Sequence, residues 1–225
     1  MQRIHDAIYA LLKDKQKGTL LDLACGQGQL GETFGEKGFN VFFADRYETP
    51  RDTSRYLKFD LNDPLPYKNE LFDIIICAES LQYLKNHEAF FSETNRVLAS
   101  EGCLVISFPN VLTLSERVYF LRRGWFSCFR PVRGNNPHKE WANVVYHVFS
   151  FVNIYQLLKK NGFKILKVFS PDISKKNGWL YPLIKGLYSL GLLFDRDTEK
   201  IRLIKWLMSR DLLCGDHLIV YSKKN

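Results

Sequence analysis

Short apolar runs alternate with amphipathic segments along the first half of the chain. The two clearest runs, TLLDLAC and LFDIIIC, each contain a single charged residue, as expected for strands buried on both faces of a parallel sheet. The runs that predict strands are residues 19–25, 40–44, 55–59, 71–77 and 102–108. Apolar residues recur at helical spacing before or between these runs, which predicts helices over residues 3–16, 29–37 and 86–99.

This alternation predicts a doubly wound α/β fold, in which ligands bind beyond the carboxyl ends of the parallel strands. The regular pattern ends at Pro109. The segments that follow are an insertion or lid, a helix, a strand, an apolar helix-prone insertion and a last strand, over residues 110–147, 151–161, 163–169, 170–214 and 216–222. We therefore expect one domain over residues 1–225 that carries two insertions.

Composition is that of an ordinary globular protein, because 46% of the 225 residues are hydrophobic and 25% are charged. The sequence contains no uncharged apolar run of about 18 residues and therefore predicts no membrane span. The N-terminal segment lacks the apolar core of a signal peptide. Five scattered cysteines without a CxxC pair favour reduced thiols in a cytoplasmic protein. The net charge of +8 suggests an acidic partner, although a merely basic surface explains it equally well.

Polar residues follow the first three predicted strands. The motif GQGQLG at residues 26–31 fits a dinucleotide fingerprint, in which glycines let the backbone approach a phosphate. Asp22 lies inside the preceding strand and favours a cationic ligand, because its carboxylate would repel a pyrophosphate at the helix N-terminus. Asp45 is placed to bind ribose hydroxyls, and Asp60 to accept a hydrogen bond from an amine such as that of adenine.

Together these residues predict a site for a nucleoside that carries a positive charge and no phosphate. Each aspartate alone also has a local explanation, since Asp22 is typical of a buried cap and Asp45 and Asp60 are typical of turns. The order of the three acids at successive strand ends favours the shared site.

At these positions the chain resembles class I S-adenosylmethionine-dependent methyltransferases. The resemblance rests on DLACGQG, Asp45, the pair Asp60-Leu61, LFDIIICAESLQYL and NRVLASEGCLVISFPN, and it continues in FSFVNIYQLLKKNGFKILKV and the terminal DHLIVYSKK. The chain is most similar to the small-molecule branch that includes ubiquinone-type and bacterial sugar or lipid methyltransferases. The resemblance implies S-adenosylmethionine as cofactor and a mostly parallel seven-stranded sheet that ends in an antiparallel hairpin.

The resemblance also implies which residues bind the cofactor. Asp22 would lie near the amino group, Asp45 at the ribose hydroxyls with Arg46 beside the adenine, and Asp60 and Leu61 at the adenine edge. The residues near the methionine moiety, the ribose and the sulfonium would be Ala24, Cys25, Gly26, Gly28, Cys77, Ala78 and Glu79. Alanine at position 24 departs from the commonest pattern, which has glycine there.

Methyl transfer requires alignment of the reactants and exclusion of water, and a hydroxyl acceptor also requires a general base. Many relatives have Glu-His where this chain has Gln82-Tyr83, so no catalytic histidine carries over from that position. We expect His138 or His147, in or beside the predicted lid, to be the base, with a structural role as the alternative for each. Weaker candidates are Glu79, Tyr83, Tyr119 and Tyr146.

Two further classes of methyltransferase do not fit. The chain reads CAES after the fourth strand, where enzymes that methylate a base or amide nitrogen have an Asn-Pro-Pro-Tyr-type sequence. A metal-dependent catechol enzyme would need clustered acids, which the sequence does not show, so we expect no metal.

The second insertion contains the apolar segment 178–194, GWLYPLIKGLYSLGLLF. This segment is compatible with a core helix, an acceptor pocket, a dimer contact, or a helix at a membrane surface aided by Lys175, Lys176 and Lys185. A helix that begins near Asp197 is expected to join the core. The arginines of the first insertion are candidate phosphate ligands or solvated charges, namely Arg117, Arg122, Arg123, Arg130 and Arg133.

The sequence thus predicts a cytoplasmic S-adenosylmethionine-dependent methyltransferase. The expected acceptor is a small molecule, such as a hydroxyl of a sugar or of a nucleotide- or lipid-linked glycan. An NAD-dependent oxidoreductase is an alternative, but no Tyr-x-x-x-Lys pair follows the fifth strand, where Arg123 comes four residues after Tyr119. A nucleic-acid methyltransferase ranks third, because only the net charge favours it and no RNA-binding module is recognisable.

Overall fold

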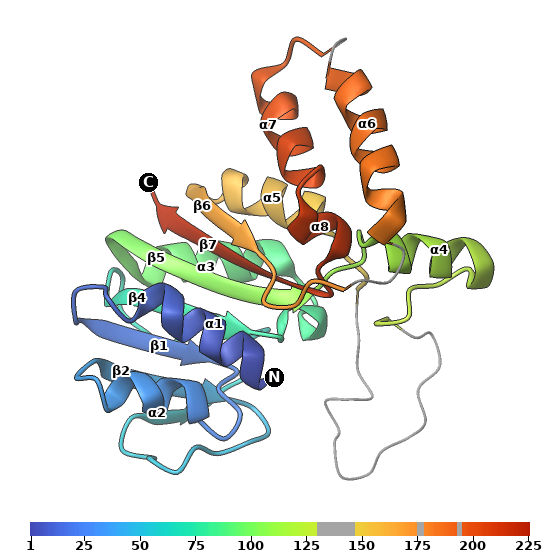
Figure 1. The fold of residues 1–225 in the computed structure, drawn as a ribbon. Coiled ribbons are helices and arrows are strands. Elements are labelled where there is room, and N and C mark those ends of the chain that lie inside the picture. The colour runs from blue at the N-terminus through green and yellow to red at the C-terminus, as the bar shows by residue number, and fades with distance from the viewer. Residues whose placement is uncertain (130–146, 175–177, 193–194) are drawn as a thin grey trace.

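The computed structural model describes residues 1–129, 147–174, 178–192 and 195–225 (Figure 1). Its sheet has seven strands in the order β3-β2-β1-β4-β5-β7-β6. In chain order these are β1 (Thr19–Leu23), β2 (Asn40–Asp45), β3 (Tyr56–Lys58), β4 (Phe72–Ala78), β5 (Leu98–Pro109), β6 (Phe163–Phe169) and β7 (His217–Lys224). The first five strands pair in parallel, whereas β7 is antiparallel to both β5 and β6. The predicted fold class, with its terminal antiparallel hairpin, is therefore confirmed.

Helices cover both faces of the sheet (Figure 1). In chain order they are α1 (Gln2–Leu12), α2 (Gln29–Gly35), α3 (His87–Val97), α4 (Leu114–Arg123), α5 (Phe151–Lys160), α6 (Tyr181–Leu192), α7 (Thr198–Leu207) and α8 (Arg210–Cys214), with short 3-10 turns η1 (Leu81–Tyr83) and η3 (Gly178–Leu180). Helices α1 and α2 pack on one face, and α3 and α5 pack on the other.

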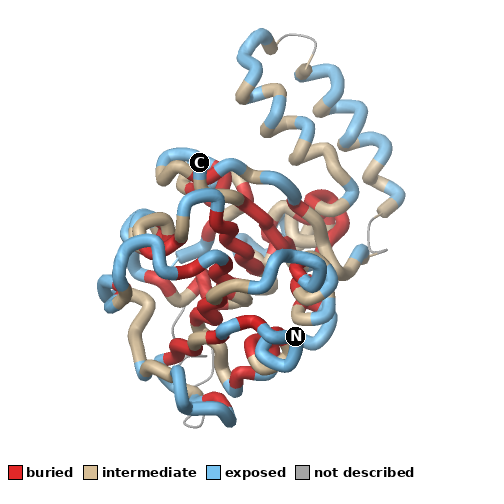
Figure 2. Tube along the Cα trace, turned by 90° about the vertical axis from the view of Figure 1, so that its left-hand side faces the viewer, coloured by how far each residue is buried: buried red, intermediate tan, exposed pale blue. Residues whose placement is uncertain are grey.

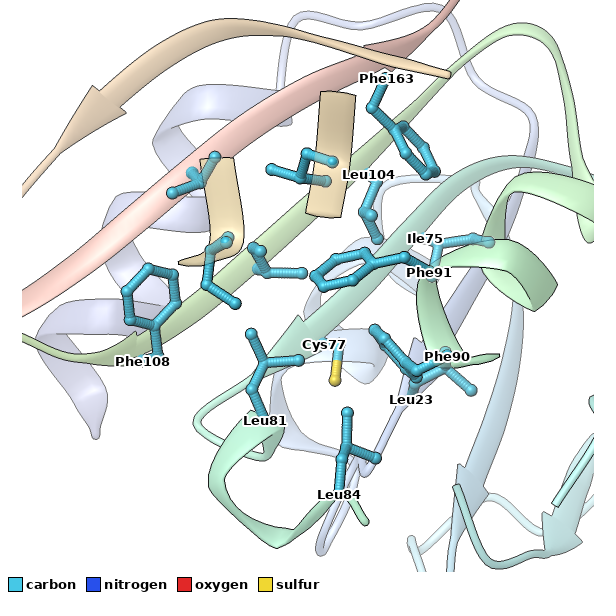
Figure 3. Close-up of a cluster of buried hydrophobic side chains, with 14 of the residues drawn as sticks. Leu23, Ile75, Cys77, Leu81, Leu84, Phe90, Phe91, Leu104, Phe108 and Phe163 are labelled. Carbon is cyan, nitrogen blue, oxygen red and sulfur yellow. The ribbon is translucent and has the colours of Figure 1, made fainter. Parts of the chain in front are cut away.

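Alternate residues of each buried strand enter different cores, because successive side chains of a strand point to opposite faces. Leu20 and Ile74 pack with α1 and α2, whereas their neighbours Leu21 and Ile75 pack with α3 and α5. Figure 3 shows part of the second core, where Phe91 of α3 lies among side chains from β1, β4 and β5. Burial on both faces explains why these strands are continuous apolar runs in the sequence.

Two predicted boundaries are wrong by four residues. Helix α1 ends at Leu12 rather than at residue 16, because the charged segment Lys13–Lys15 offers no apolar side chain to the core. Strand β5 begins at Leu98 rather than at residue 102. Leu98 pairs with Phe72 of β4 before the register shifts, so the predicted helix over 86–99 ends at Val97 instead.

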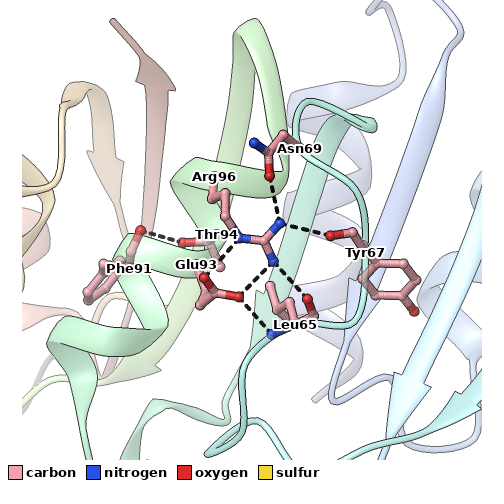
Figure 4. A network of polar contacts seen from close by, with 7 residues as sticks. All are labelled: Leu65, Tyr67, Asn69, Phe91, Glu93, Thr94 and Arg96. Atoms are coloured by element: carbon pink, nitrogen blue, oxygen red, sulfur yellow. Dashed lines mark hydrogen bonds and ion pairs between the residues drawn. The ribbon is translucent and has the colours of Figure 1, made fainter.

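Hydrogen bonds from Arg96 of α3 hold the segment between β3 and β4 (Figure 4). Its guanidinium donates to the carbonyl oxygens of Leu65 (2.7 Å) and Tyr67 (2.8 Å), to the side-chain oxygen of Asn69 (2.8 Å) and to both carboxylate oxygens of Glu93 (2.8 and 2.9 Å). One planar cation therefore fixes the path of the chain that leads from β3 into the central strand β4.

The second insertion forms an arm that projects from the body of the molecule. Helices α6 and α7 lie side by side beyond the sheet in both views (Figures 1 and 2). Neither helix contains a buried residue. On α6 the side chains of Leu183, Leu187 and Leu190 are 58%, 58% and 56% exposed, so the interpretation of this segment as core is wrong for that face.

The opposite face of the arm does pack on the body. Four residues contact a small cluster formed by Leu114, Leu213 and Cys214, namely Leu180, Tyr181, Ile184 and Tyr188. Helix α7 begins after its N-cap Asp197, as predicted, and is half-buried at Ile201 and Ile204. Lys175 and Lys176 lie outside the described residues. Among the described helices, none is both long and apolar enough to cross a membrane.

Candidate active site

The carboxyl ends of four neighbouring parallel strands border one cavity, of about 360 Å³. Strand β1 leads into the loop 24–28, β2 ends in Asp45, Asp60 follows β3 closely, and Glu79 directly follows β4. All the residues predicted to bind the cofactor line this cavity except Gly28 and Cys77. The sheet therefore brings together three acids that are far apart in the sequence.

Two glycines of the motif after β1 are required by close packing. Gly28 is the N-cap of α2 with a φ of 81°, and a Cβ there would lie 2.5 Å from the Cβ of Pro50. A Cβ on Gly31 would lie 2.4 Å from the ring of Phe43 and 3.0 Å from Oδ2 of Asp22. Gly28 thus shapes the loop from behind the cavity, and Gly31 lets α2 approach Asp22.

Ala24 and Glu79 are non-glycine residues with a φ of 55°, and they follow the adjacent strands β1 and β4. This conformation costs about 1–3 kcal/mol and persists where surrounding contacts enforce it. The backbone N–H of Glu79 donates to the carbonyl and hydroxyl oxygens of Ser107 (3.0 and 3.1 Å), and Gln82 Nε2 donates to the Glu79 carbonyl (2.7 Å). Contacts from β5 and η1 therefore hold Glu79 at the cavity wall.

Asp22 lies at the floor of the cavity and is 3% exposed. Its Oδ2 accepts one hydrogen bond, from the N–H of Gly31 (3.1 Å). Burial raises the pKa of the Asp22 carboxyl to about 7, the hydrogen bond from Gly31 opposes this rise, and the negative charge of Asp45 adds to it. A cation bound next to Asp22 would therefore strongly stabilise the ionised form of its carboxyl.

Asp45 organises the loop that follows β2. Its Oδ1 accepts hydrogen bonds from the N–H groups of Tyr47 (2.7 Å) and Glu48 (2.9 Å), and its Oδ2 accepts one from Gly26 (2.9 Å). A carboxylate has about four lone-pair sites, so one remains for a ligand. The geometry thus leaves room for one ribose hydroxyl at Asp45, where the sequence alone suggested two.

Asp60 and Arg46 form an ion pair across the mouth of the cavity. Asp60 Oδ1 also accepts hydrogen bonds from the backbone and side-chain nitrogens of Asn62 (3.0 and 2.8 Å). Partial burial works to raise the pKa of Asp60, but these hydrogen bonds and the charges of Arg46 and Lys85 outweigh it and lower the pKa. Asp60 is therefore ionised at neutral pH and can accept a hydrogen bond from an amine.

The two thiols near the cavity are neutral. Burial raises the pKa of both Cys25 and Cys77, and the charges of Asp22 and Asp45 add to the shift. Cys25 lines the cavity, whereas Cys77 is fully buried in the core beneath it. Neither thiol is therefore suited to act as a nucleophile at neutral pH.

Of the two predicted histidine bases, the structure describes only His147, which does not line this cavity. His138 lies outside the described residues, as do Tyr146, Arg130 and Arg133. His147 is exposed, with Nε2 at 3.1 Å from the carbonyl of Lys85, and lines neither of the two cavities described here. Of the weaker candidates, Glu79 and Tyr83 line the cavity beside the strand ends.

Met1, the N-cap of α1, and His5 of α1 also line the cavity, which the sequence gave no reason to expect. The helical pattern predicted α1 but not that its first turn lies over the carboxyl ends of the strands. Burial and the nearby N-terminal ammonium lower the pKa of His5. His5 is therefore mostly neutral at neutral pH and adds a polar group to the cavity wall.

A second cavity, of about 790 Å³, lies where α4 faces the end of β5 and the start of β7. It is lined by Tyr119, Arg122 and Arg123 of α4 and by His217 of β7. Arg117 does not line it, because its guanidinium donates to the carbonyl of Leu112 (2.8 Å) and to the hydroxyl of Tyr188 (3.1 Å). Of the candidate arginines, Arg122 and Arg123 thus line the second cavity, whereas Arg117 holds α4 to neighbouring groups.

Comparison with known proteins identifies the class. A family model described as a methyltransferase domain matches residues 2–168, so the chain belongs to this methyltransferase family. The chain is 29% identical over 114 residues to the putative methyltransferase YqeM of Bacillus subtilis, a match that spans 45% of this chain and 46% of that protein. It is 24% identical over 216 residues to the ubiquinone biosynthesis O-methyltransferase of Rickettsia canadensis, which spans 88% of this chain and 85% of that protein.

Solved methyltransferase structures have a similar fold. A putative S-adenosylmethionine-dependent methyltransferase from Listeria monocytogenes superposes with a TM-score of 0.62 over 100% of this chain and 98% of that one, at 17% identity. The chain therefore belongs to a methyltransferase family, as its sequence predicted, and has the fold of S-adenosylmethionine-dependent methyltransferases.

The residues present fit this cofactor, since the cavity combines ionisable carboxyls at three strand ends with the apolar side chains of Leu30, Phe59 and Leu61. When bound, S-adenosylmethionine supplies an electrophilic methyl group on a positively charged sulfur.

Proposed function

We propose that the protein transfers this methyl group to a hydroxyl of a small polar acceptor, such as a sugar or a nucleotide- or lipid-linked glycan. The observation that carries the proposal is the second cavity, whose wall of hydroxyl, guanidinium and imidazole groups lies next to the end of β4. The name of the relative from Rickettsia canadensis, an O-methyltransferase aligned over 88% of this chain, supports an oxygen acceptor.

In this proposal each acid has one role toward the cofactor. Asp22 attracts the amino group, Asp45 accepts a ribose hydroxyl through its remaining lone pair, and Asp60 accepts the adenine amine while Arg46 lies beside the ring. The backbone of the loop 24–28 and of Ala78 and Glu79 borders the methionine moiety. Alignment and exclusion of water by these residues are the main demands of the reaction.

Asp45→Ala is expected to weaken the binding of S-adenosylhomocysteine by at least ~10-fold, because it removes a ribose contact and frees three backbone N–H groups of the loop. Calorimetry on the full chain measures this. Asp52→Ala is the matched control, since Asp52 is exposed and bonds only to the nearby Ser54. Unchanged affinity in Asp45→Ala would contradict the ribose assignment.

The acceptor class is tested with labelled S-adenosylmethionine and three probes, which are catechol, UDP-glucose and glucose 1-phosphate. Methylation of a sugar hydroxyl supports the proposal, and methylation of catechol alone would move the acceptor to the phenols. Tight binding of NADH without response to S-adenosylhomocysteine would contradict the cofactor itself.

We also propose that residues 1–225 form one methyltransferase domain with insertions at 110–147 and 170–214. Helix α6 packs on α4 and α8, and Leu203, Trp206 and Leu207 of α7 pack against the core that the sheet shares with α3 and α5, which supports one domain. All five cysteines are free thiols, which favours a reducing compartment, and we propose the cytoplasm.

A further inference from the structure

Glu79 and His217 form a carboxylate–imidazole pair between the two cavities. Glu79 follows β4 and lines the cofactor cavity, whereas His217 begins β7 and lines the second cavity. Glu79 Oε2 lies 2.9 Å from His217 Nδ1, and the hydroxyl of Ser107 donates to Glu79 Oε1 (2.9 Å). The Glu79 side chain is 9% exposed and that of His217 is 37% exposed. The pair therefore joins the wall of the cofactor cavity to the wall of the second cavity.

The hydrogen bond fixes the tautomer of His217. An ionised carboxylate accepts hydrogen bonds and donates none, so Nδ1 of His217 carries the proton. In the neutral ring Nε2 is then a proton acceptor, and it makes no hydrogen bond to any residue that the structure describes. A base whose second nitrogen is held by a carboxylate is the usual arrangement for taking a proton from a hydroxyl.

The charges around His217 favour its protonated form. The hydrogen bond that His217 donates to Glu79 is the largest influence and raises the pKa of His217, and partial burial opposes it. The charges of Glu79 and Asp216 also raise this pKa, and the N-terminal ammonium lowers it. The titratable or charged side chains that line the second cavity from α4 are Glu116, Tyr119, Arg122 and Arg123. The carboxylate of Glu116 is already engaged by the backbone N–H and hydroxyl of Ser127.

The second cavity has the chemistry of a site for a hydroxylated, phosphorylated acceptor. Ser115, Tyr119 and Ser127 contribute hydroxyl groups to its wall. Arg122 and Arg123, in the last turn of α4, make no ion pair with any described residue. Guanidinium groups left without a carboxylate partner are suited to hold phosphate oxygens.

We propose that the second cavity binds a sugar phosphate or a similar acceptor and that His217, oriented by Glu79, is the base that takes the proton from its hydroxyl. This inference rests on the proposed function and assigns its catalytic residue. His217 Nε2 takes the proton as the acceptor oxygen bonds to the methyl carbon. The bond from that carbon to sulfur breaks, its electron pair stays on sulfur, and the positive charge passes from sulfur to the imidazolium beside Glu79.

Cofactor binding alone tests the position of His217. S-adenosylmethionine and S-adenosylhomocysteine carry the same amino group and differ in charge at sulfur, so the attraction of that amino group to Asp22 cancels in their affinity ratio. As the pH rises through the pKa of His217, loss of the imidazolium should favour S-adenosylmethionine over S-adenosylhomocysteine by about 3- to 10-fold. His217→Asn keeps an amide N–H for Glu79 and removes Nε2, so its ratio should change less with pH than that of the wild type.

A ratio that is independent of pH in the wild-type protein would overturn the inference while both ligands still bind. Loss of binding of both ligands would instead overturn the proposed function. The two outcomes are therefore distinguishable, and neither measurement requires a known acceptor.

Nuclear magnetic resonance of the histidine rings tests the pair and the cavity in the complex with S-adenosylhomocysteine. Glu79→Gln should lower the pKa of His217, and an unchanged titration would overturn the role of Glu79. Glucose 1-phosphate should shift the His217 signal in the wild-type protein and in Leu121→Trp, but not in Val118→Trp. Val118 lines the second cavity, whereas Leu121 of the same helix is exposed and does not line it.

No shift of His217 with glucose 1-phosphate, or an equal shift in Val118→Trp, would overturn the assignment of the cavity. For an acceptor that is methylated, His217→Asn should lower kcat about 10²–10⁴-fold. The affinity for S-adenosylhomocysteine should stay within about twofold, since His217 does not line the cofactor cavity. An unchanged kcat would overturn the role of His217 as the base.

Discussion

We expect Asp22 to make cofactor binding depend on pH. Its carboxyl is buried with a pKa of about 7, so it is mostly protonated near pH 6 and mostly ionised near pH 8. The ionised form attracts the ammonium group of the cofactor, and the affinity for S-adenosylhomocysteine should therefore rise about 10-fold between ~pH 6 and ~pH 8. Asp22→Asn should remove this rise and bind more weakly than the wild type at pH 8. Calorimetry across the pH range measures both effects.

The free protein should respond to the same variant in the opposite direction. Because the folded-state pKa of Asp22 lies above its usual value of 3.8, ionisation opposes folding at neutral and higher pH. Asp22→Asn should therefore raise the melting temperature of the cofactor-free protein at pH 8. A lower melting temperature together with a flat wild-type binding profile would contradict the role of Asp22 as a cofactor ligand.

Residues at strand ends were predictable, and residues brought in from elsewhere were not. Asp22, Asp45 and Asp60 could be predicted to converge because parallel neighbouring strands place their carboxyl ends at one edge. His217 is 138 residues from Glu79 and reaches it only because β7 enters the sheet antiparallel beside β5. No local spacing in the sequence encodes that contact, so the histidines near the first insertion were the stronger candidates.

At the scale of elements, Arg96 determines how firmly the segment before β4 is held. Arg96→Lys should lower the free energy of unfolding by about 1–3 kcal/mol, because one ammonium cannot satisfy the carbonyls of Leu65 and Tyr67 together with Glu93. Chemical denaturation measures this. Arg202→Lys is the matched control, since Arg202 has a single, exposed ion pair to Glu199 and should cost less than about 0.5 kcal/mol. Equal effects would contradict the network's role.

Elements of the first half were predictable because each is both locally patterned and buried in a two-faced sheet. Helices α2 and α3 and strands β2 and β4 lie within two residues of their predicted bounds. The second insertion was predictable as helical but not in its placement. The apolar composition of 178–194 fits a core helix, and the exposure of Leu183 and Leu187 depends on how far α6 projects, which composition does not encode.

At the scale of the whole molecule, the arm and the sheet should differ in stability. Amide hydrogens of α6 and α7 are expected to exchange much faster than those of β1 and β4, because neither helix contains a buried residue whereas most residues of both strands are buried. Hydrogen exchange with mass spectrometry measures this on the full chain. S-adenosylhomocysteine should protect the segments 24–30 and 45–48, most of whose residues line the cofactor cavity, and leave the arm unchanged.

The dependence of hydrogen exchange in α6 on protein concentration shows whether the exposed face of the arm stays in water or pairs with a second copy of the chain. In a monomer, the leucines exposed on α6 stay in water and α6 exchanges at the same rate in dilute and concentrated protein. If the arm instead pairs with a second copy, protection of α6 rises with concentration while protection of β4 does not, since β4 is already buried. Protection of α6 equal to that of β4 in dilute protein would contradict the weak packing of the arm on the body.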